Sequence, residues 1–185
     1  MKYSFAWRPT LCLLTLLLVC QAIPAQAKRR DHLNEAEADR VREAQIIDER
    51  TKVFIKAAER RFLALTNPSA ATSKEALKDA EKWGAWPVGT RAELLGDLAG
   101  LLDEAINNID GVAESHPNEK LLPKALRALA TACQRWQPVL LNLRAQAQPA
   151  EKQPLEEALE YIESILQAGG QLPPEEKGKN AKTDH

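Results

Sequence analysis

The chain has 185 residues, with 25 basic and 26 acidic side chains and a formal net charge of −1. This near balance excludes the strongly basic class to which most nucleic-acid-binding domains belong. Two of the three cysteines, Cys12 and Cys20, stand close to the N-terminus, so Cys133 is the only cysteine in the rest of the chain. A single cysteine cannot close an internal disulfide, and we therefore expect a fold that depends on packing alone.

The N-terminal segment 1–27 has the composition of a secretory signal peptide. Lys2 and Arg8 precede an apolar run over 11–20, and small residues before Lys28 form a cleavage site. We predict cleavage after Ala27 and export to the periplasm or the extracellular space. The apolar run is about half the ~20 residues that cross a bilayer, which disfavours a spanning helix. The basic residues that follow leave one alternative, an uncleaved N-terminus that holds the protein at the membrane.

Apolar residues recur at gaps of three and four over 31–65, and this spacing predicts a long helix. A polar stretch interrupts the pattern at 48–51. We therefore expect a bend or break there, with Asp48 as the cap of a second helical segment. A short helix is predicted over 74–82, with Ser73 as its cap.

Two tryptophans, Trp83 and Trp86, stand three positions apart in the loop KWGAWPVGT, residues 82–90. Tryptophan combines a large apolar face with one N–H donor, which suits a ligand site or a partner contact. The same rings suit a structural role that closes one end of a helical domain. We favour packing of at least one ring and keep the pair as the first place to seek a ligand.

Thr90 and Glu93 have the spacing of a capping box, which predicts the start of a third helix. A one-sided leucine-rich stripe runs along this helix over 94–112. The fourth helix is predicted over 119–148. Pro138 lies inside its apolar pattern and predicts a kink, because proline removes one backbone donor.

A fifth helix is predicted over 154–168, with Gly169 placed to close it. The apolar pattern then stops, and the proline-rich, charged residues 170–185 predict a disordered tail. Long amphipathic helices with short links are typical of bundles. We therefore expect an all-α domain over 28–169, an antiparallel bundle of about four long helices with coiled-coil-like packing, plus the short helix.

The fourth predicted helix is basic, and Lys120, Lys124 and Arg127 have the spacing of one helical face. Such a face could bind phospholipid head groups or an acidic polymer. The alternative is charge pairing with the acidic third and fifth helices. We favour pairing, because ion pairs between neighbouring helices are common even though each contributes little stability.

The sequence contains none of the common motifs for haem attachment, di-iron binding, zinc proteolysis, nucleotide binding or serine hydrolysis. We therefore expect no enzyme activity, no cofactor and no metal site. Cys133 falls on the apolar line of the fourth helix, where cysteine usually acts as a small buried hydrophobe. His32 and His116 are expected at the ends of different helices.

The stretch 31–62 and the leucine-striped helices after it resemble bacterial exported proteins made of a signal peptide and an all-helical domain. This resemblance implies no activity and no site residues. The sequence thus favours a non-enzymatic interaction or structural module of the cell envelope, with a protein partner and no nucleic acid. The alternative is a binding protein for a small ligand or an anionic polymer, which would use the Trp83/Trp86 loop or the basic face.

Overall fold

Every regular element is helical in residues 31–174, the part of the chain that the computed structural model describes, which confirms the all-α class. The predicted signal peptide 1–27, its cleavage site and residues 175–185 of the predicted tail lie outside the described residues. The elements follow the order α1 (Glu35–Glu43), α2 (Ile47–Thr66), the 3₁₀ helix η1 (Pro68–Thr72), α3 (Lys74–Trp83), α4 (Arg91–Ser115), α5 (Leu122–Arg144) and α6 (Pro149–Gly170).

Side-chain caps define the starts of three helices. At α1, Asn34 accepts from the backbone N–H of Glu37 while Glu37 accepts from that of Asn34, which is a capping box. Ser73 caps α3, and Thr90 with Glu93 forms the capping box of α4. The predicted caps of α3 and α4 are therefore confirmed. The capping box of α1 was not predicted from the sequence.

The predicted break in the first helical region is present at residues 44–46, between α1 and α2, but Asp48 does not cap the second helix. The N-cap residue of α2 is Ile46, which makes no side-chain capping bond. The buried carboxylate of Asp48 instead lies 3.2 Å from Nζ of Lys52 and 2.7 Å from Nζ of Lys124. The expectation for Asp48 is wrong because a lysine on α5, far away in sequence, binds its carboxylate.

The last helix has different limits from those expected. It begins at Pro149 rather than Pro154, and proline is favourable at a first position because no N–H partner is needed there. Gly169 does not close the helix, which continues to Gly170. A Cβ on Gly169 would lie only 2.7 Å from the Cβ of Ala130. The close approach of α5 and α6 therefore explains this glycine.

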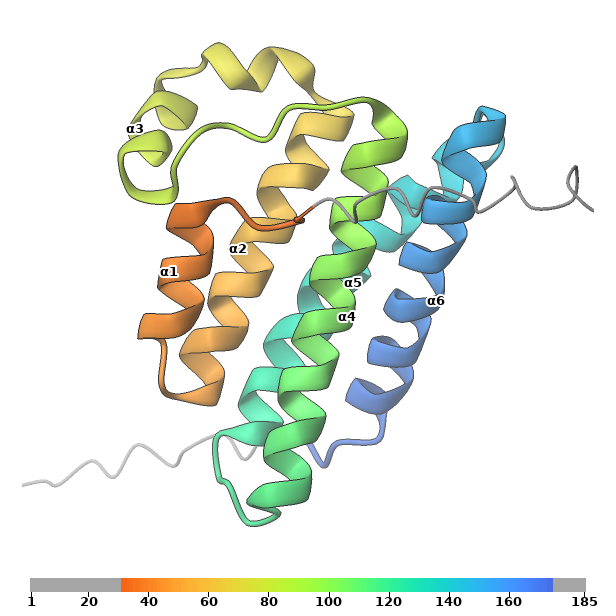
Figure 1. The fold of residues 1–185 in the computed structure, drawn as a ribbon. Helices are drawn as coiled ribbons and strands as arrows, with labels where there is room; N and C mark the ends of the chain where they lie inside the picture. Colours follow the sequence, from red (N-terminus) through yellow and green to blue (C-terminus); the bar gives the residue numbers. More distant parts are fainter. Residues whose placement is uncertain (1–30, 175–185) are drawn as a thin grey trace, which may run out of the picture. The chain divides into compact units, whose positions relative to one another are not determined.

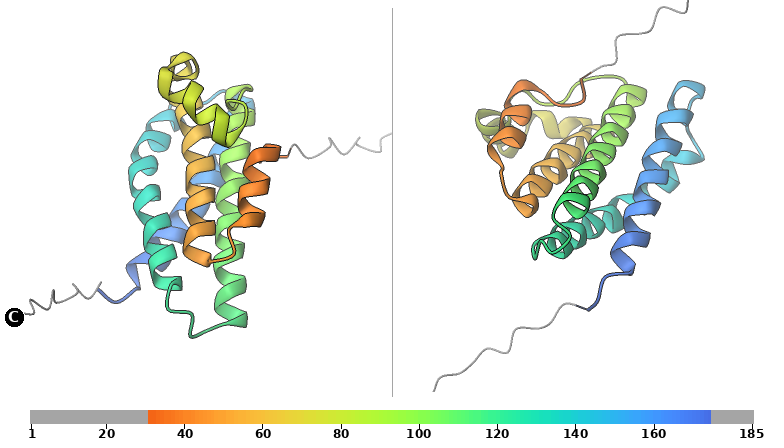
Figure 2. Two further views of the ribbon diagram at one scale, coloured as in Figure 1. Left: turned by 90° about the vertical axis from the view of Figure 1, so that its left-hand side faces the viewer. Right: turned by 60° about the horizontal axis from the view of Figure 1, so that its bottom comes forward.

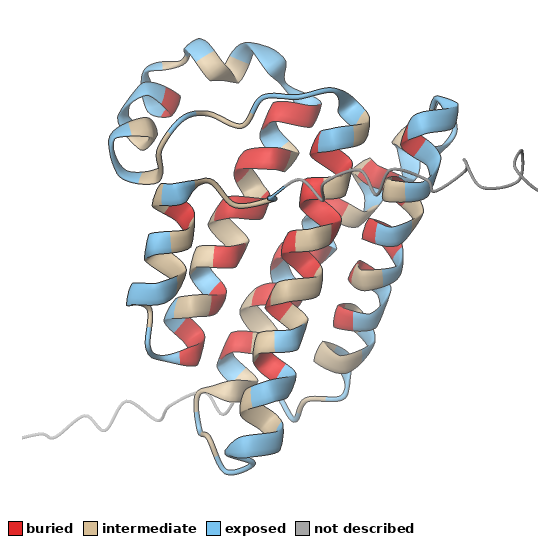
Figure 3. Cartoon of the chain, viewed as in Figure 1, coloured by how far each residue is buried: buried red, intermediate tan, exposed pale blue. Residues whose placement is uncertain are grey.

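Four long helices, α2, α4, α5 and α6, lie side by side around one hydrophobic core (Figures 1 and 2). α4 packs against α2 and α6, and α5 packs against the same two helices. Buried positions follow the facing sides of these helices (Figure 3). The leucine-rich stripe of α4 is buried as predicted, with Leu98 and Leu101 fully inaccessible.

The shorter elements α1, η1 and α3 lie at one edge of the molecule, beside α2 (Figure 1). The backbone of α3 packs against η1 and α1 rather than directly on α2. Side chains therefore have to bridge the space between α2 and α3. The loop 84–90 then leads the chain from α3 to α4.

Candidate functional site

A buried ionic cluster joins α1 to α2. Glu37 is 0% exposed, and its Oε1 accepts from Nη1 of both Arg60 and Arg61, which are 2% and 4% exposed. Its Oε2 accepts from the backbone N–H of Asn34 at 3.1 Å. One carboxylate thus serves a helix cap and two buried guanidinium groups. Such burial is tolerated only where the charges are paired and hydrogen-bonded.

Arg60 extends this cluster to the tryptophan loop. Its guanidinium donates to the carbonyl oxygens of Trp83, Gly84 and Ala85, each at 2.8 Å. It also lies over the ring of Trp86, 5.8 Å from the ring centroid. Burial lowers the pKa of Arg60, and the negative charge of Glu37 opposes that shift. The loop backbone is therefore fixed by a side chain from the interior.

Helix α1 holds the same loop from its other side. Asn34 donates from Nδ2 to the carbonyl oxygen of Trp83 at 2.9 Å, and Arg40 donates from Nε to that of Lys82 at 2.7 Å. The guanidinium of Arg40 lies 4.8 Å from the ring centroid of Trp83. Gly84 has a φ of +70°, and a Cβ there would meet the side chain of Asn34 at 3.0 Å. Glycine is thus required where α1 approaches the loop.

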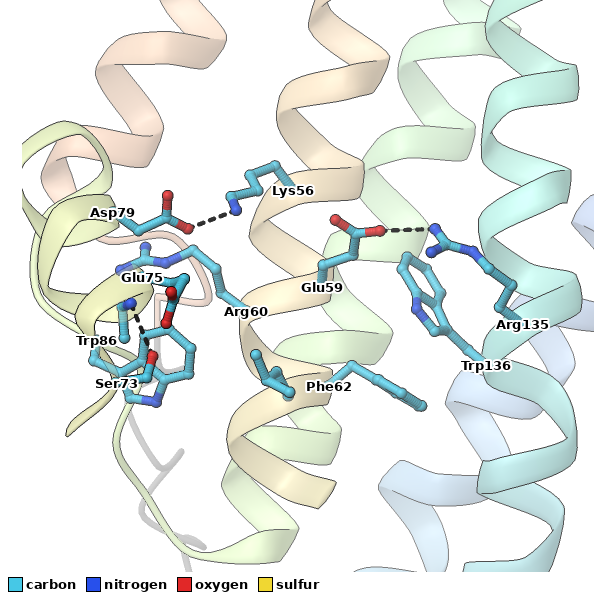
Figure 4. A pocket seen from close by; sticks show the side chains of 12 residues that line it. Lys56, Glu59, Arg60, Phe62, Ser73, Glu75, Asp79, Trp86, Arg135 and Trp136 are labelled. Atoms are coloured by element: carbon cyan, nitrogen blue, oxygen red, sulfur yellow. Dashed lines mark hydrogen bonds and ion pairs between the residues drawn. The ribbon is translucent and has the colours of Figure 1, made fainter. Parts of the chain in front are cut away.

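Both tryptophans are half-buried, and Trp86 packs against the hydrophobic core. This is the packing that the sequence predicted for at least one ring. Trp86 also forms one wall of a pocket of about 380 Å³ between α2, α3 and α5 (Figure 4). The structure therefore gives this residue a structural contact and a place in a cavity.

The pocket has a mainly apolar interior. Phe62 and Leu63 of α2 and Trp136 of α5 line it together with Trp86. The rings of Phe62 and Trp136 lie 6.0 Å apart between their centroids, inclined by 33°. Trp136 is almost fully buried, whereas Leu63 is 41% exposed and marks the open side. Apolar walls with a few polar groups are typical of small-molecule sites.

Ion pairs stand on two sides of this cavity (Figure 4). Lys56 of α2 lies 2.5 Å from a carboxylate oxygen of Asp79 on α3. Arg135 of α5 lies 2.7 Å from a carboxylate oxygen of Glu59 on α2. Glu75 of α3 also lines the pocket and is exposed. The two pairs connect α2 to α3 and to α5.

The predicted basic face is divided among different contacts. Lys120 lies in the turn before α5, so the helical spacing that related it to Lys124 does not apply. Lys124 pairs with Asp48, and Arg127 donates to the carbonyl oxygen of Pro173. The structure therefore does not arrange these three cations as one helical face, and two of them already have partners within the protein.

Cys133 is fully buried in the core, as expected, and burial raises the pKa of its thiol to about 12. Nε2 of His32 lies 2.9 Å from a carboxylate oxygen of Glu104. Residues 31–174 contain no group of His, Cys, Asp and Glu side chains suited to hold a metal ion. No helix in this part is long and apolar enough to cross a bilayer.

Sequence reasoning missed the cluster of Glu37, Arg60 and Arg61, although two signals were present. Asn34 and Glu37 have capping-box spacing. Arg61 stands three residues after Ala58 and four before Leu65, so it occupies the apolar face of α2. A buried arginine needs a buried acidic partner, and Glu37 of the capping box is a candidate for that partner.

No family model matches this sequence, and searches of curated proteins and of solved structures returned no match either.

Proposed function

We propose that this chain is an exported, non-enzymatic helical module that binds a small, mainly apolar molecule in the pocket between α2, α3 and α5. The single observation that carries this proposal is the pocket itself. Its volume of about 380 Å³ falls in the range of about 300–1,000 Å³ that is usual for small-molecule sites. The scaffold in this proposal is an antiparallel bundle of α2, α4, α5 and α6, to which α1 and α3 add the loop and one pocket wall.

The fixed tryptophan loop supports a pre-formed site. Arg60 and Asn34 both bind the backbone at Trp83, three residues before Trp86. A wall that is already ordered loses little conformational freedom when a ligand arrives, which favours affinity. The contacts of Arg60 and Asn34 that fix the loop therefore also hold Trp86 at the cavity.

The charged groups at the pocket favour binding over acid–base chemistry. Asp79 and Glu59 are each held in an ion pair, with Lys56 and Arg135 respectively. A general acid or base has to reach the reacting atom, and a carboxylate held in an ion pair is less free to do so. We therefore retain the expectation of a non-enzymatic protein that acts through binding.

A neutral fluorescent dye tests this function. We expect N-phenyl-1-naphthylamine to bind with increased emission and Leu63→Glu to weaken binding at least about tenfold. Losing roughly 50 Å² of apolar contact at about 25 cal/mol per Å² removes about 1.3 kcal/mol. Leu141→Glu is the matched control, because Leu141 on α5 is 46% exposed and does not line the pocket. Absence of dye binding, or equal binding by both variants, would overturn the proposal.

A further inference from the structure

One carboxylate at the pocket is not neutralised by the protein. Glu75 lies in the first turn of α3 and lines the cavity with its exposed side chain. Within residues 31–174 its carboxylate takes part in no hydrogen bond or ion pair. The other acids at the cavity, Glu59 and Asp79, each have a basic partner. Among the described charged residues that line the pocket, Glu75 is therefore the one without an ion-pair partner.

The charges beside Glu75 on α3 are mixed. Asp79 stands four residues after it and is paired with Lys56, while Lys78 stands three residues after it. A ligand cation beside Glu75 would pair with its carboxylate, whereas an anion would be repelled by it.

The basic groups at the pocket are poor anchors for an anion. Lys56 and Arg135 would have to leave Asp79 and Glu59 before they could bind one. Arg60 is 2% exposed, and both of its terminal nitrogens donate to Glu37 or to loop carbonyl oxygens. An anionic ligand therefore has to break existing contacts, while a cationic ligand breaks none.

The aromatic walls suit the apolar part of a ligand. Trp86 and Phe62 line the pocket, and the guanidinium of Arg60 already lies over the ring of Trp86. We propose that the pocket binds a small amphipathic molecule with one cationic amine, whose apolar body contacts Trp86 and Phe62 and whose amine pairs with Glu75. This inference rests on the proposed function, because it names the class of molecule that enters the same pocket.

Three probes of equal shape and different charge test the inference: phenylbutylamine, phenylbutanol and phenylbutanoate at neutral pH. Each is measured by its displacement of the naphthylamine dye. We expect the amine to bind at least about fivefold more tightly than the carboxylate, as one weakly screened ion pair allows. Glu75→Gln should bring this ratio close to one. Glu163→Gln, which removes an exposed carboxylate on α6, should leave the ratio as in the natural sequence.

Equal binding of all three probes, or a preference for the carboxylate, overturns the cation inference and leaves the apolar pocket as the proposed function. Loss of the amine preference in Glu163→Gln also overturns it, because the effect would then be one of net charge. Failure of all three probes to displace the bound dye also overturns the cation inference, whereas absence of dye binding overturns the proposed function together with it.

Discussion

Arg60 connects the interior of the protein to the tryptophan loop, because its guanidinium is shared between Glu37 and three loop carbonyl oxygens. Burying two arginines beside one carboxylate costs desolvation energy, which close hydrogen bonds offset. With all three charged side chains present, such a cluster adds little net stability to the fold. Removing one partner is costly, since charges then remain buried without compensation.

Glu37→Gln should therefore destabilise the protein by about 3–5 kcal/mol, because it leaves Arg60 and Arg61 buried without a counter-charge. Chemical denaturation of the two proteins measures the difference. Glu59→Gln is the control, since Glu59 pairs with Arg135 at the surface and such pairs contribute about 0–1 kcal/mol. Similar losses for both variants would contradict the role given to Glu37.

Asp48 makes a pH-dependent contribution to the free energy of unfolding. The hydrogen bond from Lys124 lowers the pKa of Asp48 in the folded protein, against the opposite effect of burial, and Lys52 adds to the lowering. A carboxylate whose pKa is lower in the folded state contributes stability above its unfolded pKa of about 3.9. That stability is lost as the pH falls from the unfolded pKa of Asp48 through its lower pKa in the folded protein.

The unfolding free energy of Asp48→Asn should consequently lie below that of the natural sequence at neutral pH. The difference should shrink as the pH falls below about 4. Denaturation curves over a pH series measure it. A difference that stays constant with pH would show that the charge of Asp48 does not stabilise the fold.

At the level of elements, helix starts marked by a local capping residue were more predictable than tertiary contacts. Ser73 and Thr90 cap α3 and α4 because a cap is a local signal that needs only a few neighbouring residues. Asp48 and Gly169 were misassigned because both look like local signals but serve contacts with another helix. Local patterns predict where a helix forms, whereas tertiary contacts decide how individual residues are used.

Some parts of the candidate site could be predicted from local sequence, and others depend on tertiary contacts. The tryptophan loop was found from composition, because two rare large side chains stand there among glycine and proline. The pocket was not predictable, because Phe62, Glu75 and Trp136 come from three helices whose arrangement the sequence does not state. The three cations of the predicted basic face do not share one helix, because Lys120 lies in the turn before α5.

Two glycines test the packing of the elements. Gly169→Ala should destabilise the protein by about 1–3 kcal/mol, because the new Cβ would collide with Ala130 and separate α5 from α6. Gly111→Ala on α4 should stabilise it by about 0.5–1 kcal/mol, since a Cβ there meets no atom within 4 Å and alanine favours the helix. Thermal unfolding separates the two, and a stabilising Gly169→Ala would refute the close approach.

For the whole molecule, we propose that the N-terminal segment directs export and that the helical domain then binds its ligand outside the cytoplasm. N-terminal sequencing of the exported protein should give a start at Lys28, because cleavage is predicted after Ala27. A start at Met1 in protein recovered from membranes would instead support the uncleaved anchor. The pocket proposal does not depend on this outcome.

The central claim is that the pocket beside Trp86 binds a small apolar molecule. Residues 31–174 contain three tryptophans, and Trp86 and Trp136 line the pocket while Trp83 does not. The most direct measurement is therefore the nuclear magnetic resonance of the indole N–H groups during titration with N-phenyl-1-naphthylamine. We predict that the signals of Trp86 and Trp136 shift with one common affinity while that of Trp83 stays nearly fixed. Unmoved pocket signals, or a shift confined to Trp83, would contradict the account.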